Sequence, residues 1–150
     1  RLTMTGRAIC LNDQRQLVKG RNQAFLDGHT MESWSAKLDR RIFLLPGPGA
    51  PEDSSFFATL GGGAKAIRFD TRLFFEAFSP NIWLSPINSG NADRRPAPRG
   101  DWLYVPVSAS RDEFRLNRVR RGLKAGPDTV VEISITAPIA PDLLRDLLAA

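Results

Sequence analysis

The sequence predicts a single α+β domain in which short helices flank a mixed or mostly antiparallel sheet. The chain has 150 residues, the usual length of one domain, and its 42% hydrophobic residues are enough to bury a core. Short strand-like runs are interspersed with short helix-like runs. The connections between them, such as residues 106–126, are too irregular for a doubly wound series of strands and helices. Residues 1–150 are therefore expected to form one domain without internal repeats.

Capping residues and apolar spacing predict the elements of the first half of the chain. Residues 1–29 read mainly as loop, with one short helix near residues 16–25. Thr30 is the expected cap of the next helix, in which three apolar residues share one face: Met31, Trp34 and Leu38. The elements predicted from Thr30 onward are a helix, a strand, a helix closed by three glycines and a second strand: residues 31–38, 42–45, 54–60 and 66–69.

The second half begins with a helix over residues 72–78, for which Asp70 or Thr71 is the cap. The apolar residues expected on its buried side are Leu73, Phe74 and Phe78. A further helix over residues 111–121 begins with a capping box made by Ser110 and Glu113. Three strands and a terminal helix beginning at Pro141 complete the prediction: residues 82–85, 102–107, 129–136 and 141–148.

The charge of the chain is carried mainly by arginine. The sequence has 17 Arg against 4 Lys, and its formal net charge is +5. Guanidinium groups bind phosphate and carboxylate through two parallel hydrogen bonds, which suits a nucleotide or a nucleic acid as partner. A GC-rich coding sequence, which also favours Ala, Pro and Gly, is the alternative explanation of the ratio.

Several classes of protein are excluded by what the sequence lacks. No apolar run approaches the roughly 20 residues that cross a bilayer, and no signal segment opens the chain. We therefore expect a cytoplasmic protein without a membrane partner. Cys10 is the only cysteine and His29 the only histidine, so neither a disulfide framework nor a metal site is expected. Because the chain opens on Arg1 without an initiator Met, it reads as part of a longer polypeptide.

Two features are candidates for function, and each has a structural alternative. The polar, proline-containing stretch of residues 84–100 joins two predicted strands, and reads equally as a binding loop or as an ordinary solvent loop. Glu132 lies in mid-strand between β-branched residues, and projects either to solvent or into a cleft. The arginines of residues 111–121 could bind phosphates or simply form a solvated helix face.

The two candidate features also carry a family resemblance. Seven short motifs occur in one order along the chain: residues 12–15, 27–30 followed by Trp34, 40–43, 69–71, 84–90, 96–100 and 130–133. In this the chain resembles a bacterial domain family known only as a domain of unknown function. The most specific motifs are Ser-Pro-Ile-Asn-Ser-Gly and Pro-Ala-Pro-Arg-Gly, at residues 85–90 and 96–100. That family is similar to the DarT-type ADP-ribosyltransferases, which are toxins that modify DNA with NAD.

The resemblance implies a split-sheet ADP-ribosyltransferase fold and an NAD-dependent enzyme. It implies a toxin or phage-defence component that modifies nucleic acid or protein and has a cognate inhibitor. Glu132, followed by a Pro-containing turn and a helix, takes the place of the catalytic glutamate. The expected NAD-binding residues are one aromatic, three polar and three basic side chains: Phe43, Ser85, Asn88, Ser89, Arg94, Arg95 and Arg99. Trp83 is the alternative to Phe43 as the aromatic wall of the nicotinamide site.

The chain departs from the family pattern at its beginning. The family's domain starts with a further strand and helix, and the strand carries the residue that grips the NAD ribose. This sequence does not contain those elements. The alternative function is a non-catalytic module that binds nucleic acid through residues 94–99 and 111–121. A domain that binds a protein partner, with neither activity, is the third possibility.

Overall fold

The computed structural model describes residues 2–4, 7–9, 23–47, 67–90, 97–120, 122–123 and 129–147. The chain divides into two compact units. The first contains Arg1–Arg40 and Ser89–Trp102, and the second contains Arg41–Asn88 and Leu103–Ala150. The organisation as a single domain stays a prediction.

The second unit contains a small open antiparallel sheet. Its four strands have the order β3-β6-β4-β5 and the bounds Ile42–Leu44 (β3), Glu132–Ile135 (β6), Ile82–Ser85 (β4) and Val105–Pro106 (β5). Every pair of neighbours in this sheet is antiparallel. The predicted α+β class and the antiparallel pairing are therefore confirmed.

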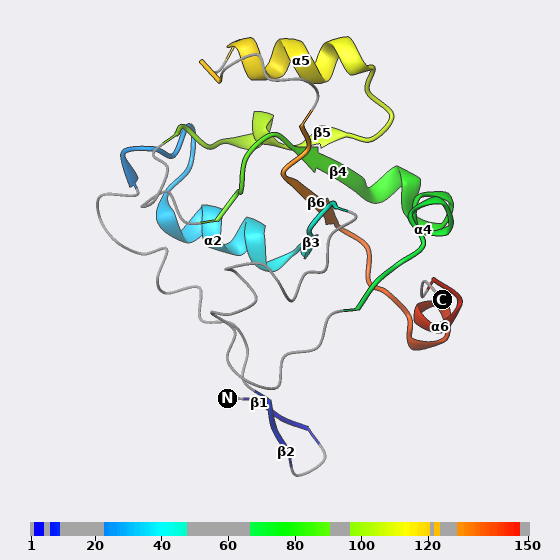
Figure 1. The fold of residues 1–150 in the computed structure, drawn as a ribbon. Helices are drawn as coiled ribbons and strands as arrows, with labels where there is room; N and C mark the ends of the chain where they lie inside the picture. Colours follow the sequence, from blue (N-terminus) through cyan, green and yellow to red (C-terminus); the bar gives the residue numbers. More distant parts are fainter. Residues whose placement is uncertain are drawn as a thin grey trace. The chain divides into compact units, whose positions relative to one another are not determined.

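One face of this sheet is apolar and carries the core. Successive strand residues point to opposite faces, and the register aligns Leu84 with Ile133, and Ile82 with Ile135. Two helices, α4 (Thr71–Phe78) and α6 (Pro141–Leu147), cover this face (Figure 1). The buried residues of the core cluster come from α4, β4, β6 and α6: Phe74, Phe78, Ile82, Ile135 and Leu147. Each such side chain contributes about 1.5–3 kcal/mol by leaving water.

The helix starts of the second unit form as predicted. The Asp70 side chain accepts a hydrogen bond from the Leu73 backbone N–H at 2.9 Å and so caps α4. The helix α5 spans Arg111–Arg120. It begins with the predicted capping box, since the Ser110 N–H donates to Glu113 and the Glu113 N–H donates to Ser110.

The first unit is built around the helix α2 (Met31–Asp39), which Thr30 caps as predicted. Its three apolar residues on one face are all buried: Met31, Trp34 and Leu38. The segment before the helix runs parallel to a later one, where Leu26 forms a bridge with Arg99. Two short antiparallel strands, β1 (Leu2–Met4) and β2 (Arg7–Ile9), also belong to this unit.

Four predictions about the elements are wrong in part. Residues 101–103 form a 3-10 helix (η4, Asp101–Leu103) instead of a strand, so only the short β5 remains of the strand predicted at 102–107. Of the strand predicted at 66–69, the described residues 67–69 keep only a single bridge at Phe69, whose ring also packs on Phe74 of α4, and Ile67 is 58% exposed. Leu73 is 36% exposed, not buried. β6 starts at Glu132, three residues later than expected.

Other predictions fall on residues outside the described ones. These are the helix near 16–25 over most of its length, the helix at 54–60 with its glycines, Cys10, Arg94 and Arg95. Among the helices of the described part, none combines the length and apolar character needed to cross a membrane.

Candidate functional site

The second face of the sheet carries polar and aromatic side chains. The strand register places Phe43, Ser134 and Trp83 side by side across three strands, and Ser85 beside Glu132 in the next row. Arg41, which precedes β3, contacts Ser134 and Trp83, and its guanidinium also lies over the ring of Tyr104, which precedes β5. We call these residues the polar face: Arg41, Phe43, Trp83, Ser85, Tyr104, Glu132 and Ser134.

Glu132 is buried in the polar face. Its side chain lies on the inner strand β6, between β3 and β4, and the residue is only 4% exposed. Its neighbours Ser85 and Ser134 are fully buried at 0%. The interpretation of Glu132 as a residue on a wet face is therefore wrong. The alternation of side chains along the strand correctly placed Glu132 on the face opposite the apolar residues. It could not show that this second face is shielded from water.

Two hydrogen-bond donors of the polar face are shielded from water without a partner. The Ser85 hydroxyl and the indole N–H of Trp83 are buried, and neither has a hydrogen-bond partner among the described residues. A buried donor left in this state costs about 1–3 kcal/mol. A bound ligand or an ordered water molecule would satisfy both groups.

Arg41 reaches over the polar face and is the residue that the sequence reasoning missed. Its Nη1 donates to the Ser134 hydroxyl at 3.0 Å. Its Cζ lies 3.7 Å from the ring centroid of Tyr104 and 5.5 Å from that of Trp83. Strand alternation could have indicated it, because Arg41 stands two residues before Phe43 and so shares its face.

The polar face combines several kinds of recognition in one place. It holds a buried carboxylate, a guanidinium stacked on an aromatic ring, and two buried hydrogen-bond donors that have no acceptor among the described residues. Aromatic surface with a few well-placed polar groups is the usual lining of a small-molecule site. This arrangement can bind a ring-containing ligand that bears hydroxyl or amide groups.

The other predicted site residues are distributed over both units. Phe43 is on the polar face and 36% exposed, while Asn88 is exposed beyond the end of β4. Ser89 and Arg99 belong to the first unit and are buried. The Ser89 carbonyl accepts from the Trp34 indole at 3.2 Å, and the Arg99 guanidinium donates to the Ala97 carbonyl at 2.7 Å. Their proposed contacts with NAD stay predictions.

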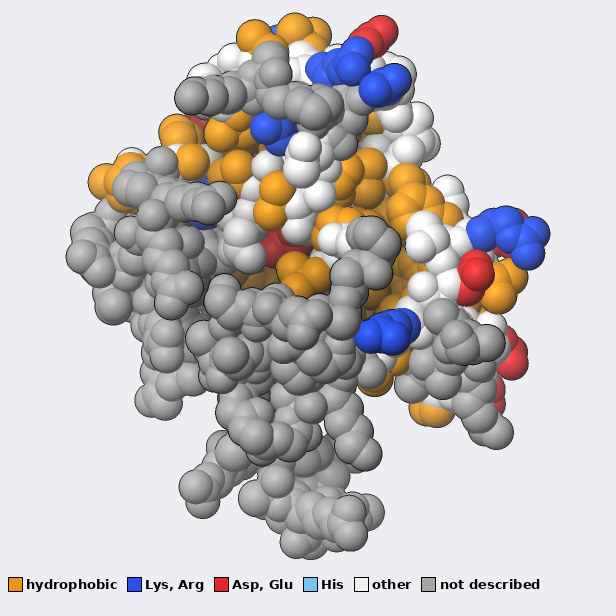
Figure 2. Space-filling view, viewed as in Figure 1, with side chains coloured by type: hydrophobic (Ala, Val, Ile, Leu, Met, Phe, Trp, Pro, Cys, Tyr) orange, Lys and Arg blue, Asp and Glu red, His pale blue; other side chains and the backbone are white. Residues whose placement is uncertain are grey.

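The arginines of α5 do not act as one group. Figure 2 shows Lys and Arg side chains at the top, where α5 lies in Figure 1. Arg118 is partly buried, and its guanidinium donates to the carbonyls of Pro86 and Thr129, both at 3.2 Å. Arg115 lies 3.8 Å from the Asp112 carboxylate. Arg118 therefore holds loops in place, and part of the remaining charge is offset on the helix itself.

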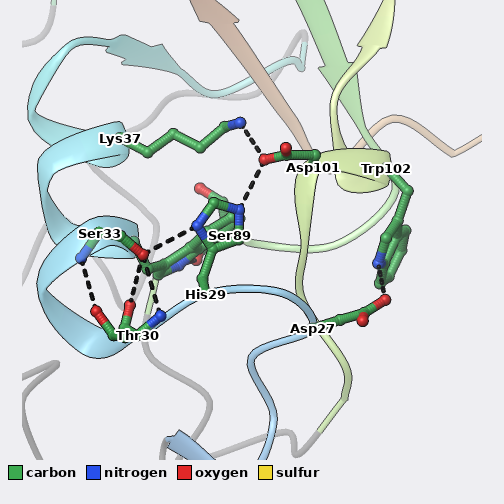
Figure 3. A network of polar contacts seen from close by, with 9 residues as sticks. Asp27, His29, Thr30, Ser33, Lys37, Ser89, Asp101 and Trp102 are labelled. Atoms are coloured by element: carbon green, nitrogen blue, oxygen red, sulfur yellow. Dashed lines mark hydrogen bonds and ion pairs between the residues drawn. The ribbon is translucent and has the colours of Figure 1, made fainter.

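A second polar cluster lies in the first unit (Figure 3). The His29 ring lies 3.1 Å from the Ser33 hydroxyl and 2.8 Å from the Asp101 carboxylate, which also accepts from Lys37. The Trp102 indole donates to Asp27 at 3.2 Å. The sequence indicated only a turn at His29, because its partner Asp101 is 72 positions away.

This cluster predicts a pH dependence of stability. Hydrogen bonds from Lys37 and then from His29 hold the pKa of Asp101 below its ordinary value of 3.8. Since the folded-state pKa is lowered, the ionised carboxylate stabilises the fold above the unfolded value, and this contribution is lost as the pH falls through the folded value. Asp101→Asn should therefore reduce the free energy of unfolding at pH 7 and converge with the unmodified chain at low pH. Urea unfolding of both chains from pH 7 to pH 2 measures this difference, and a gap that stays constant over the range would contradict it.

Comparison with known proteins gives a family but no activity. The model of DUF7002, a family of unknown function, matches residues 1–147. Comparisons with curated proteins and with solved structures each returned no match. The expectation of a family labelled only as a domain of unknown function is confirmed.

Proposed function

The chain belongs to DUF7002 over residues 1–147, and from its polar face we propose that it is an NAD-dependent ADP-ribosyltransferase-like enzyme with Glu132 as catalytic carboxylate. The observation that carries this proposal is the position of Glu132, buried on an inner strand beside Ser85 and its unpartnered hydroxyl. A carboxylate is costly to bury, so its retention in a sheet favours a functional role.

The chemistry of ADP-ribosyl transfer fits a fixed, shielded carboxylate. Cleavage of the bond between nicotinamide and ribose develops positive charge on the sugar. A carboxylate held beside the ribose stabilises that charge more strongly in a dry site than in water. The same group can hold the acceptor or accept its proton as the new bond to the ribose forms. Burial of Glu132 supplies the dry setting.

Two further features support the relation to DarT-type ADP-ribosyltransferases. A small antiparallel sheet in an α+β chain is compatible with that fold. Glu132 is followed by a Pro-containing turn and by α6, which is the order that the resemblance implies. The acceptor on DNA, RNA or protein, a toxin or phage-defence role and a cognate inhibitor are parts of this same proposal.

The test is transfer of labelled ADP-ribose by the full-length protein. The protein is incubated with NAD and with DNA, RNA or protein acceptors, and the masses of the products are measured by mass spectrometry. We expect an added ADP-ribose, with a rate that Glu132→Gln lowers about 100-fold or more. Glu76→Gln is the matched control, because the Glu76 side chain is exposed on α4, where it makes a surface ion pair with Arg72 at 3.8 Å. It should leave the rate unchanged.

The opposite results identify the alternative function. Transfer that survives Glu132→Gln, or no transfer to any acceptor, would contradict the proposal. A nucleic-acid-binding module would instead show salt-dependent affinity for DNA or RNA that survives Glu132→Gln and falls on arginine replacement. Arg111→Ala and Arg120→Ala test this, since both residues are exposed on α5.

A further inference from the structure

The polar cluster of the first unit brings a hydroxyl, an imidazole and a carboxylate into contact in that order (Figure 3). The Ser33 hydroxyl lies 3.1 Å from Nδ1 of His29, and Nε2 of the same ring lies 2.8 Å from the Asp101 carboxylate. Ser33 is in the first turn of α2, His29 directly precedes the cap of this helix, and Asp101 begins η4. A nucleophile in contact with a base that a third group orients is the arrangement by which proteins activate a serine.

The hydrogen bonds determine where the imidazole carries its proton. Hydrogen bonds from Lys37 and then from His29 hold the pKa of Asp101 below its ordinary value, so its carboxylate is ionised at neutral pH and can only accept. Nε2 of His29 therefore carries a proton, and in the neutral ring Nδ1 is an acceptor. The Ser33 O–H is a donor within reach of Nδ1. The ring also makes an edge contact with the buried Trp34, at a centroid distance of 5.1 Å.

Helix capping does not account for the whole arrangement. The Ser33 hydroxyl accepts from the Thr30 N–H at 3.0 Å in the capping box of α2 and lies 3.2 Å from the Thr30 carbonyl. The capping box of α5 is made by Ser110 and Glu113, two residues of one turn, so a box does not need an imidazole or a distant carboxylate. The hydroxyl proton of Ser33 has two acceptors nearby, and only His29 is basic enough to take it up, since a carbonyl is not a base at neutral pH.

We propose that Ser33 is a nucleophile that takes the acyl group of activated carboxylic esters, with His29 as general base and Asp101 as the residue that positions the imidazole. Ser33 is exposed and the His29 side chain is 17% exposed, so an ester can reach the attacking oxygen. The cluster belongs to the first unit, whereas Glu132 and the rest of the polar face belong to the second. The acyl-transfer activity is therefore independent of the proposed ADP-ribosyl transfer.

The acyl-transfer step needs only the ester, the three side chains and water. The Ser33 oxygen attacks the carbonyl carbon of the ester, and its proton passes to Nδ1 of His29. A bond forms between Oγ and the acyl carbon, and the bond from that carbon to the alcohol oxygen breaks. The leaving oxygen takes up the proton from His29, which returns the ring to its neutral form. Water then hydrolyses the acyl-serine with His29 again as base, and Asp101 stabilises the imidazolium in both steps.

The experiment measures acetylation of the native protein by p-nitrophenyl acetate. After a short exposure, mass spectrometry of proteolytic peptides identifies the acetylated residues. We expect Ser33 to react about 100-fold or more faster than Ser110, which is the matched control. Both residues are exposed and both hydroxyls belong to a capping box, but the only histidine of the chain contacts Ser33. Since this comparison is made within the unmodified chain, it does not depend on the folding of a variant.

Variants test the base and the positioning residue. His29→Ala should lower the acetylation rate of Ser33 about 100-fold, and added imidazole should restore part of that rate, which loss of a merely structural residue would not allow. Asp101→Asn should lower the rate about tenfold or more, because an amide can present an N–H to the ring and favour the wrong tautomer. Asp101→Glu keeps a carboxylate and should retain more of the rate. Asp39→Asn, at an exposed carboxylate of α2, is the control and should leave the rate unchanged.

The opposite results are equally clear. Equal acetylation of Ser33 and Ser110, or acetylation of Ser33 that survives His29→Ala, would overturn the inference. An acetyl group found on His29 in place of Ser33 would also overturn it, because the imidazole itself would then be the nucleophile. An unchanged rate for Asp101→Asn would overturn the positioning role of Asp101. None of these outcomes depends on whether ADP-ribosyl transfer occurs.

Discussion

Replacing Trp34 by alanine is expected to lower the free energy of unfolding by about 4 kcal/mol, the range usual for deletion of a buried indole. Trp34 is only 1% exposed and is the largest side chain among the fully buried residues. Its indole donates to the Ser89 carbonyl, and its ring meets the edge of His29 at a centroid distance of 5.1 Å. Alanine would remove this hydrogen bond, the ring contact and the apolar surface together.

Urea denaturation followed by circular dichroism measures the loss. Leu116→Ala is the control, because Leu116 is 47% exposed on α5 and its truncation should change stability by about 0.5 kcal/mol or less. If Trp34→Ala costs no more than Leu116→Ala, then the burial of α2 described above is incorrect.

Replacing Gly100 by alanine is expected to cost about 3 kcal/mol, because the new methyl group has no room. A Cβ at this position would lie 2.7 Å from the Trp102 indole nitrogen and 2.8 Å from the Asp27 carbonyl oxygen. Either the parallel segments separate, or Trp102 swings away and gives up its hydrogen bond to Asp27.

The matched control for this substitution is Gly28→Ala. Gly28 has a φ of +76° but open space around its Cα, so alanine should cost only about 1 kcal/mol of backbone strain. Urea denaturation gives both values, and tryptophan fluorescence reports whether the Trp102 environment changes. A loss for Gly100→Ala as small as that for Gly28→Ala would show that the close approach of the two segments is relieved easily.

The helices that the structure describes after residue 30 were predictable from the sequence because their starts are specified locally. Thr30, Asp70 and the pair Ser110–Glu113 each make the predicted capping bond within three residues of chain. The ends of the strands were less predictable, because a strand extends only as far as it is hydrogen-bonded to another strand that is distant in the sequence. Trp102 has strong strand propensity, yet its bond to Asp27, 75 positions away, is made from a 3-10 turn.

The sequence indicated which residues belong to the candidate site, but not how deeply they are buried or which groups surround them. Glu132 stood out because a carboxylate is unfavourable within an apolar strand. Its burial depends on what covers the sheet, which strand alternation does not encode. The unpartnered state of Ser85 and Trp83 is likewise a property of the assembled sheet, and so is the reach of Arg41 to Ser134.

The first unit is assembled from two pieces of chain, Arg1–Arg40 and Ser89–Trp102, which the segment Arg41–Asn88 separates in sequence. During synthesis the earlier piece leaves the ribosome first, yet three of its contacts need residues 89, 101 and 102. Until those residues emerge, the apolar stripe of α2 has no completed core around it. Nascent chains of this length are therefore the ones expected to recruit chaperones or to aggregate.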